Sequence, residues 1–296
     1  MASIKDLKKR IVTVKNTQQT TRAMKMVSAA KLRRAQEAIN NNRPFAQRMG
    51  ALLNTVISLP DLSATSPLLA RDSVEGEGKK LLLLLVTSDR GLCGGFNGNI
   101  IKQTQRWIKA NSDGYAKVTL GFVGRRGYDF FKNRRSDLGP YYSELSGKVS
   151  FAKAKKLAAA LMERYLAGEF DEIKVVYNEF KNAVTQTVLV ENYLPLSQKA
   201  GAEQKSDVVP TLYIVRPSAE ALFETLLSKY FSIHLFRILL DSQASEHGAR
   251  MSAMENATKN AGDMIRKLTL QFNKQRQASI TKELLEIISG SESQKS

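Results

Sequence analysis

Apolar residues recur every three to four positions near the beginning of the chain, a spacing typical of the seam of a coiled coil. Polar Gln18 and Thr21 interrupt this stripe, which then resumes out of phase, a shift that changes the supercoil locally. Residues 3–58 contain one proline, Pro44, which we expect to kink or divide the helix. The pattern predicts a long helix over 1–58. Its apolar positions are Ile4, Leu7, Ile11 and Val14, followed out of phase by Met24, Val27 and Ala30.

A second and longer helix is predicted at the other end, over 217–296. After Pro217 the sequence contains no further proline, and it has only two glycines before residue 290. At 1.5 Å per residue, such a helix would be about 105 Å long and would overhang an antiparallel partner by about 20 Å. Two heptad seams mark it. One seam comprises Ile233, Leu240, His247, Met254, Ala261 and Leu268, and the other comprises Tyr230, Arg237, Ala244, Met251, Thr258, Ile265 and Phe272.

The overhanging end of this second helix is apolar. Two interpretations stay open at this point: a bare apolar tip on a soluble protein indicates a partner, whereas terminal segments also commonly fray or fold back. The apolar positions are Ile280, Leu284, Ile287 and Ile288.

The middle of the chain alternates between buried-strand and helix patterns, which favours an open α/β sheet. We expect strands at 79–88, 117–123, 172–180, 185–193 and 211–216, and helices near 97–110, 126–134 and 150–168. The predicted fold class is therefore α/β plus a long antiparallel coiled coil. A Rossmann-like open-sheet domain, 76–216, is inserted between the terminal helices 1–58 and 217–296, which pair with each other.

The charge of the chain is strongly positive and unevenly distributed. The net charge is +17, and residues 1–58 hold 12 basic and two acidic residues. Such an excess indicates an anionic partner, which can be nucleic acid, lipid headgroups or an acidic protein face, although charge runs are often only solvated helix faces. The longest aliphatic run, Leu81 to Val86, is far shorter than the roughly 20 residues that cross a bilayer.

Candidate catalytic chemistry is sparse. The glycine-rich loop 88–97 lies between a strand and a helix, where phosphates often bind, but it lacks the Gly-Lys-Ser/Thr ending of a phosphate-binding loop. Cys93 is the only cysteine and His234 and His247 are the only histidines, so a disulfide is excluded and a cysteine-built metal site is not expected. We therefore predict no catalytic residue, no cofactor and no metal.

Three stretches together resemble the gamma subunit of F-type ATP synthases. The first is Ile4 to Ile11 with Asn16 to Gln18 and Thr21 to Lys31, the second is the loop Ser88 to Gly95, and the third is Ser245 to His247 with Arg250 and Met251, continuing through Asn273 to Leu284. The resemblance implies a non-catalytic rotor shaft that couples proton-driven rotation of a membrane ring to ATP synthesis, and ATP hydrolysis to pumping in reverse. A basic coiled-coil protein that binds DNA or organises chromosomes remains the alternative.

The resemblance also implies partners and contact residues. One copy would lie in a hexameric head of alpha and beta subunits, with the active sites on beta. It would also contact the epsilon subunit and the c-subunit ring, at the cytoplasmic face of a bacterial inner membrane, without nucleic acid and without spanning the membrane. The contacts implied at the shaft tip and a catch loop of beta are Arg276, Gln277, Ile280, Thr281, Glu283 and Leu284. Those implied at acidic loops of beta are Lys9, Arg10, Met24 and Lys25, and Tyr213 would lie at the foot near the membrane ring.

Overall fold

The computed structural model describes residues 3–57, 68, 78–135, 137–143, 149–183, 185–196 and 219–293. The chain divides into two compact units, one formed by Met1–Ser28 with Arg250–Ser296 and the other by Ala29–Ala249. Helix α1 (Ile4–Ile57) and helix α5 (Ala219–Ser293) each contribute to both units. The predicted terminal helices are thus confirmed as elements. The domain limits drawn at 58, 76 and 216 stay a prediction.

The larger unit contains a five-stranded sheet. Its strands are β1 (Lys80–Val86), β2 (Lys117–Val123), β3 (Leu138–Tyr142), β4 (Glu172–Phe180) and β5 (Gln186–Leu194). Their order is β3-β2-β1-β4-β5; β5 runs antiparallel to β4, and the other pairs are parallel. The open α/β sheet is therefore confirmed. Four of the five predicted strands are present, and the candidate at 211–216 lies outside the described residues.

Strand β3 is the element that the sequence pattern missed. It is short and contains Gly139 and Pro140, two residues that are depleted in strands. Proline lacks a backbone N–H and is tolerated mainly on edge strands. The position of β3 at the edge of the sheet explains why this segment pairs with β2 although its composition does not predict a strand.

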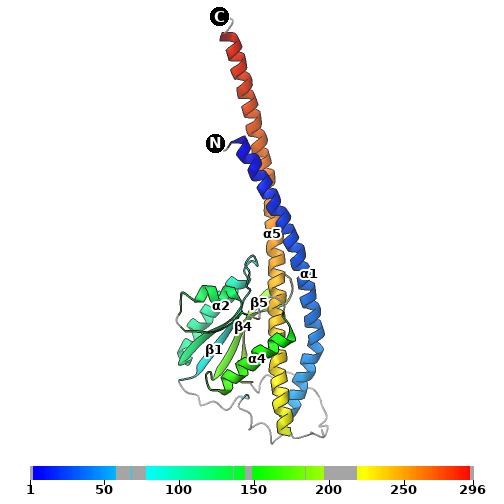
Figure 1. Ribbon diagram of the computed structural model, residues 1–296, viewed down its shortest axis with the longest axis vertical. Coiled ribbons are helices and arrows are strands. Elements are labelled where there is room, and N and C mark those ends of the chain that lie inside the picture. The colour runs from blue at the N-terminus through cyan, green and yellow to red at the C-terminus, as the bar shows by residue number, and fades with distance from the viewer. Residues whose placement is uncertain are drawn as a thin grey trace. The chain divides into compact units, whose positions relative to one another are not determined.

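Helices cover both faces of the sheet (Figure 1). The side chains of β1 alternate between the two cores, as the strand period requires. Leu82 and Leu84 pack in one apolar cluster with helix α4 (Phe151–Leu166) and the first part of α5. Leu81, Leu83 and Leu85 pack in the other cluster with α2 (Phe96–Asn111) and α3 (Arg125–Phe131). All five leucines are fully buried, which explains why β1 reads as a continuous apolar run.

One side-chain contact and one glycine shape the turns beside β1 and β2. The Asp89 Oδ1 atom accepts a hydrogen bond from the Arg125 backbone nitrogen, 3.0 Å away, at the start of α3. Gly124 has φ +91°, and a Cβ there would lie 2.0 Å from the Thr87 carbonyl oxygen. Only glycine fits at this crossing of two chain segments.

The heptad seams of α5 are confirmed by burial. Ile233, Leu240, His247, Met254 and Ala261 are all buried, and Leu268 is half-buried. The companion seam is buried at Ala244 and half-buried elsewhere. Small and polar residues thus occupy seam positions without interrupting the helix.

The predicted shift of phase in α1 is wrong. Ser28 is 3% exposed whereas Val27 is 56% exposed, and Ala30 is also exposed. The inward positions continue in one heptad register through polar Gln18, Thr21 and Ser28 to Leu32 and Ala35. The prediction assumed that only apolar residues face inward. Short hydroxyl side chains can also lie there, because they donate a hydrogen bond to a backbone carbonyl oxygen one turn earlier in the same helix. The Ser28 hydroxyl, for example, donates to the Met24 carbonyl oxygen over 2.8 Å. Helix α1 also continues past Pro44 and is not divided there.

Within the smaller unit, α1 and α5 pair antiparallel through polar contacts. The Gln18 amide nitrogen donates to the Thr258 carbonyl oxygen over 3.4 Å, and the Thr258 hydroxyl donates to that of Thr21 over 2.8 Å. One turn further along α1, the Lys25 ammonium pairs with Glu255. Rising numbers on α1 meet falling numbers on α5, as the antiparallel prediction requires.

Candidate interaction surfaces and a polar cluster on helix α5

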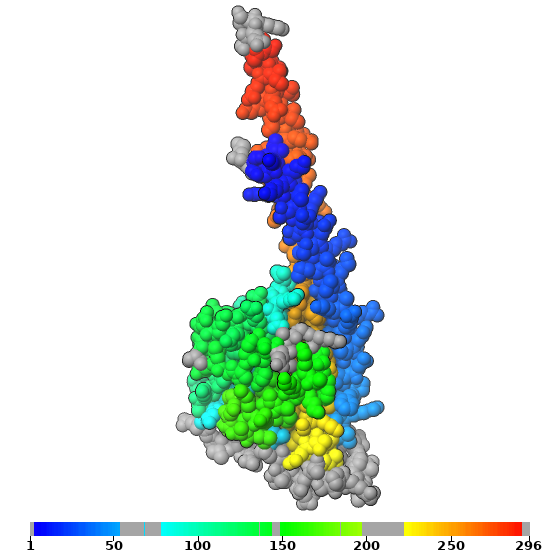
Figure 2. Space-filling view, in the orientation of Figure 1, coloured from blue at the N-terminus to red at the C-terminus, as the bar shows by residue number. Residues whose placement is uncertain are grey.

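The final part of α5 is exposed to solvent. Residues 280–291 are all exposed, and the exposed fraction is 49% for Ile280, 54% for Leu284 and 68% for Ile287. Figure 2 shows no other described residue of this unit over this end of the helix on the face in view. The helix continues to Ser293 and does not fold back. The helix therefore does not fold back on itself here, and a partner at this apolar end stays a prediction.

The polar residues predicted at this end share its exposure. Arg276, Gln277, Thr281 and Glu283 are all exposed. The Thr281 hydroxyl donates to the Gln277 carbonyl oxygen over 3.0 Å, which holds it against its own helix. The structure thus brings this group together on one segment of one helix.

The basic residues at the start of α1 border a shallow groove in the same unit. Lys9 and Arg10 are exposed, so their charges face solvent. The groove has a volume of about 540 Å³. Its lining residues are Asp6, Lys9, Arg10, Thr13, Val14, Met264 and Leu268. Positive charge and apolar side chains therefore lie side by side here.

Met24 and Lys25, the other two residues predicted to meet acidic loops, are half-buried. The Lys25 Nζ atom lies 2.6 Å from the Glu255 Oε1 atom. This lysine already has an anionic partner on α5, which the sequence pattern did not reveal. Tyr213, the predicted foot residue, lies outside the described residues.

Three side chains of the glycine-rich loop, Ser88, Cys93 and Asn97, contact one another in the larger unit. Cys93 is buried, and its sulfur lies 3.2 Å from the Asn97 side-chain nitrogen and 3.7 Å from the Ser88 hydroxyl. Asn97 and Ser88 also bond to each other over 2.8 Å. These contacts join the end of β1 to the first turn of α2. The loop is thus a tight turn packed around a buried thiol.

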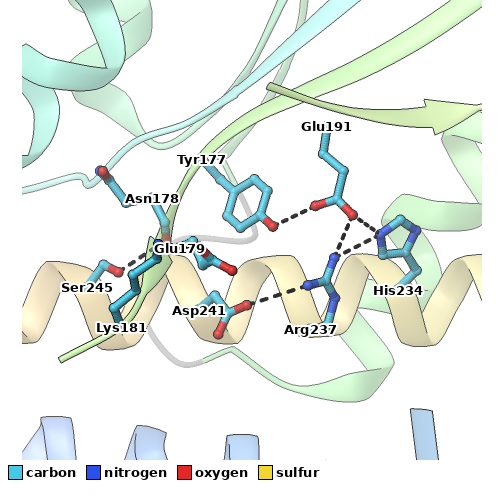
Figure 3. Close-up of polar contacts among 9 residues, drawn as sticks. All are labelled: Tyr177, Asn178, Glu179, Lys181, Glu191, His234, Arg237, Asp241 and Ser245. Carbon is cyan, nitrogen blue, oxygen red and sulfur yellow. Dashed lines mark hydrogen bonds and ion pairs between the residues drawn. The ribbon is translucent and has the colours of Figure 1, made fainter. Parts of the chain in front are cut away.

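A partly buried polar cluster links α5 to β4 and β5 in the larger unit, and the sequence pattern does not predict it (Figure 3). Glu191 is at its centre. One carboxylate oxygen accepts the Tyr177 hydroxyl at 2.5 Å, and the other lies 2.7 Å from Arg237 Nη2 and 2.9 Å from His234 Nε2. Arg237 also lies 4.0 Å from Asp241, one turn along α5. Glutamate, tyrosine and arginine at scattered positions carry no spacing signal, so only the tertiary structure brings them together.

The pKa values of the two acids in this cluster, Glu191 and Asp241, shift in opposite directions. Burial raises the pKa of Glu191, but the hydrogen bond and charge of His234 and the charge of Arg237 outweigh it, and the pKa falls to about 2. For Asp241 burial dominates, and nearby Glu179 and Glu191 add to it. The pKa of Asp241 therefore rises to about 6 in spite of Arg237. Burial also raises the pKa of the Tyr177 phenol.

Two further properties concern the described part of the chain. No helix there is long and apolar enough to cross a membrane. No three or more His, Cys, Asp or Glu side chains there are grouped so that they could hold a metal ion.

Comparison with known proteins identifies the relatives of this chain. The profile of the ATP synthase family matches residues 3–293. An ATP synthase gamma chain of Geotalea uraniireducens (strain Rf4) is 47% identical over 293 residues, covering 99% of both chains. One from Anaeromyxobacter sp. (strain Fw109-5) is 45% identical over 297 residues, covering 100% of both. The chain belongs to the ATP synthase gamma chain family.

Solved structures agree with this membership. A chain in the central stalk and c-ring structure of the Tetrahymena thermophila mitochondrial ATP synthase matches with a TM-score of 0.57 and 28% identity, over 80% of this chain and 99% of that one. A chain in the rotor of the Euglena gracilis mitochondrial ATP synthase matches with a TM-score of 0.61 and 22% identity, over 94% and 98% of the two chains. The second likeness shows the fold alone. The gamma chain family and its fold are thus the ones that the resemblance predicted.

Proposed function

We infer that this chain is the central rotor shaft of an F-type ATP synthase, where it couples proton-driven rotation of a membrane ring to ATP synthesis and ATP hydrolysis to pumping in reverse. One observation carries the inference: gamma chains match this sequence at 47% identity along 99% of its length. The chain is itself non-catalytic, and the active sites lie on the beta subunits of the surrounding head. No finding favours the DNA-binding alternative.

The mechanism is a coupling of orientation to conformation. An off-axis shaft presents a different face to each of three beta subunits, and each orientation favours an open or a closed catalytic site. Contacts shift such an equilibrium only by their differential energy in the two states. The exposed end of α5 and the exposed basic face of α1 are the surfaces in this chain that support such contacts.

The contact residues follow from these surfaces and from the family resemblance. Arg276, Gln277, Thr281 and Glu283 would bind a catch loop of beta, and Ile280 and Leu284 would lie in an apolar sleeve of the head. Lys9, Arg10, Met24 and Lys25 would face acidic loops of beta, with Lys25 shared between those loops and Glu255. Tyr213 would lie at the foot.

The assembly would hold one copy of this chain with alpha and beta subunits, an epsilon subunit and the c-subunit ring. We place it peripherally, at the cytoplasmic face of a bacterial inner membrane. Its +17 net charge fits acidic protein surfaces in such a complex.

A pull-down tests this function. The tagged full-length chain is recovered from native membranes solubilised in mild detergent, with and without nuclease. Co-purification of alpha, beta and epsilon subunits that survives nuclease is the expected result. Recovery of DNA without these subunits would instead support the alternative. The matched control is the double variant Arg276→Ala, Gln277→Ala, which should retain epsilon and recover less alpha and beta.

A further inference from the structure

Helix α5 is held on the β4–β5 hairpin by directional contacts along about four turns, all within the larger unit. At one end, the buried Tyr193 hydroxyl donates to the Phe231 carbonyl oxygen over 3.0 Å. At the other end, the buried Ser245 hydroxyl donates to the Asn178 carbonyl oxygen over 3.1 Å. Between them lies the Glu191 cluster (Figure 3). These contacts fix both the axial position and the rotation of this stretch of helix.

The close approach continues one turn further. A Cβ added at Gly248 would lie 3.3 Å from the Ala183 carbonyl oxygen, which is tighter than ordinary van der Waals contact. The backbone of α5 therefore passes the end of the hairpin at a distance that suits glycine. A larger side chain there would displace the helix from the sheet.

Directional contacts matter because apolar packing alone does not specify rotation. Hydrophobic burial is non-directional and depends on area, so Phe231 and Leu235 could pack against the sheet in several registers. Turning the helix by one residue would remove Arg237 and His234 from Glu191 and leave a half-buried carboxylate with no cationic partner, held only by the Tyr177 hydroxyl. A partly desolvated charge that loses its cationic partners is unfavourable, so the cluster favours a single rotation.

We propose that Tyr177, Glu191, His234 and Arg237 form a torsional anchor: they are positioning residues through which the α/β fold turns helix α5 without slipping. The proposal rests on the rotor function inferred above. Helix α5 runs without interruption from Ala219 to Ser293. Rotation imposed on the anchor therefore passes along this helix to its exposed end.

Stability alone does not account for this cluster. Ion pairs that are largely removed from water, as the Glu191–Arg237 pair is, are commonly no more stabilising than apolar residues of similar volume. In this cluster the folded state favours the ionised form of Glu191, whose pKa is lowered. It disfavours the ionised form of Asp241, whose pKa is raised, so the two effects oppose each other. What apolar replacements would not reproduce is the fixed rotation of the helix.

The test measures twist in the assembled complex. The head is fixed to a surface and a rod is attached to Lys109→Cys, an exposed position on α2; Cys93 is the only native cysteine and is buried. The angular fluctuations of the rod are recorded while the rotor is stalled. Protons pumped per ATP hydrolysed are measured in vesicles. The variant is Arg237→Met, which keeps an unbranched stem and removes the contacts to Glu191 and Asp241.

We expect a broader angular distribution and a loss of pumping per ATP for Arg237→Met, with partial recovery in Arg237→Lys. The control is Tyr115→Phe, which removes a 2.7 Å hydrogen bond to Glu172 on β4 without touching α5. Urea unfolding of the purified chains shows whether the two variants differ in stability. Should Arg237→Met not assemble, Tyr177→Phe removes a single hydrogen bond of the anchor and is measured in the same way.

If the angular fluctuations and the proton pumping of Arg237→Met equal those of Tyr115→Phe, the proposal is overturned. This failure is distinct from failure of the rotor function. If the rod on the unmodified complex does not turn during ATP hydrolysis, the rotor function itself is wrong. If it turns and the anchor variants remain equally stiff, only the anchor is wrong.

Discussion

At the scale of single residues, the local environment of each carboxyl group sets the direction of its pKa shift. Glu191 and Asp241 lie near the same arginine, yet their pKa values separate to about 2 and about 6. Glu191 has three polar partners within 2.9 Å, whereas the carboxylate of Asp241 is 4.0 Å from Arg237 and is mostly desolvated. The number and distance of partners therefore set the direction of each shift.

Asp241→Asn should stabilise the chain at neutral pH. A raised carboxyl pKa leaves stability intact below the ordinary value of 3.8 and reduces it as pH rises through about 6. Removing the charge should therefore raise the free energy of unfolding at pH 7.5 by up to about 3 kcal/mol and change it little at pH 4. Urea unfolding at both pH values measures this difference. Glu163→Gln, at an exposed position, is the control and should show no such dependence.

Neutralising Lys25 should have a mild effect. Its partner Glu255 lies 2.6 Å away, but the two side chains are 38% and 57% exposed, and exposed ion pairs contribute only about 0–1 kcal/mol. A double-mutant cycle with Lys25→Gln and Glu255→Gln, read by urea unfolding, gives the coupling energy. A value well above 1 kcal/mol would contradict this view of the pair.

At the scale of elements, the two long helices tolerate polar and small seam residues because backbone bonding satisfies them. Helix α1 accommodates Pro44 at an exposed position, so one proline does not necessarily end such a helix. Ala261 is different, because it is buried in the α5 seam. A proline there removes a backbone hydrogen bond and crowds the preceding turn where another helix packs.

Ala261→Pro should uncouple proton flow from ATP synthesis, because it weakens the helix by about 3 kcal/mol or more. Proton-driven synthesis and ATP hydrolysis are measured with the assembled variant in vesicles. Ala261→Gly is the matched control and should keep most coupling, since glycine costs only about 1 kcal/mol in a helix. Normal coupling in a stably assembled proline variant would refute a rigid shaft.

At the scale of the whole molecule, the distribution of charge indicates the partner. Residues 1–58 carry 12 of the basic residues and only two acidic ones. An acidic partner would be attracted over roughly a Debye length, about 8 Å at physiological ionic strength. This attraction affects the rate of assembly more than the final affinity.

The double variant Lys9→Gln, Arg10→Gln should slow assembly of the chain with the alpha and beta subunits, and the difference from the native chain should shrink as salt is added. Stopped-flow association at several salt concentrations measures it. Lys117→Gln, at an exposed position on β2, is the control and should leave the rate unchanged. An equal slowing in the control would show that only net charge matters.

The sequence alone determined the elements with strong local patterns: both terminal helices, the heptads of α5, strand β1 and the family. These signals are local, because periodicity and residue type along one segment are enough to read them. Only the tertiary structure decided three other features. They are the pairing of β3 at the sheet edge, the unbroken register of α1 through Thr21 and Ser28, and the meeting of Glu191 with Arg237. Each depends on packing against a segment distant in sequence: β2 pairs with the proline-containing edge strand, α5 decides which face of α1 is covered, and Arg237 neutralises the partly buried charge of Glu191.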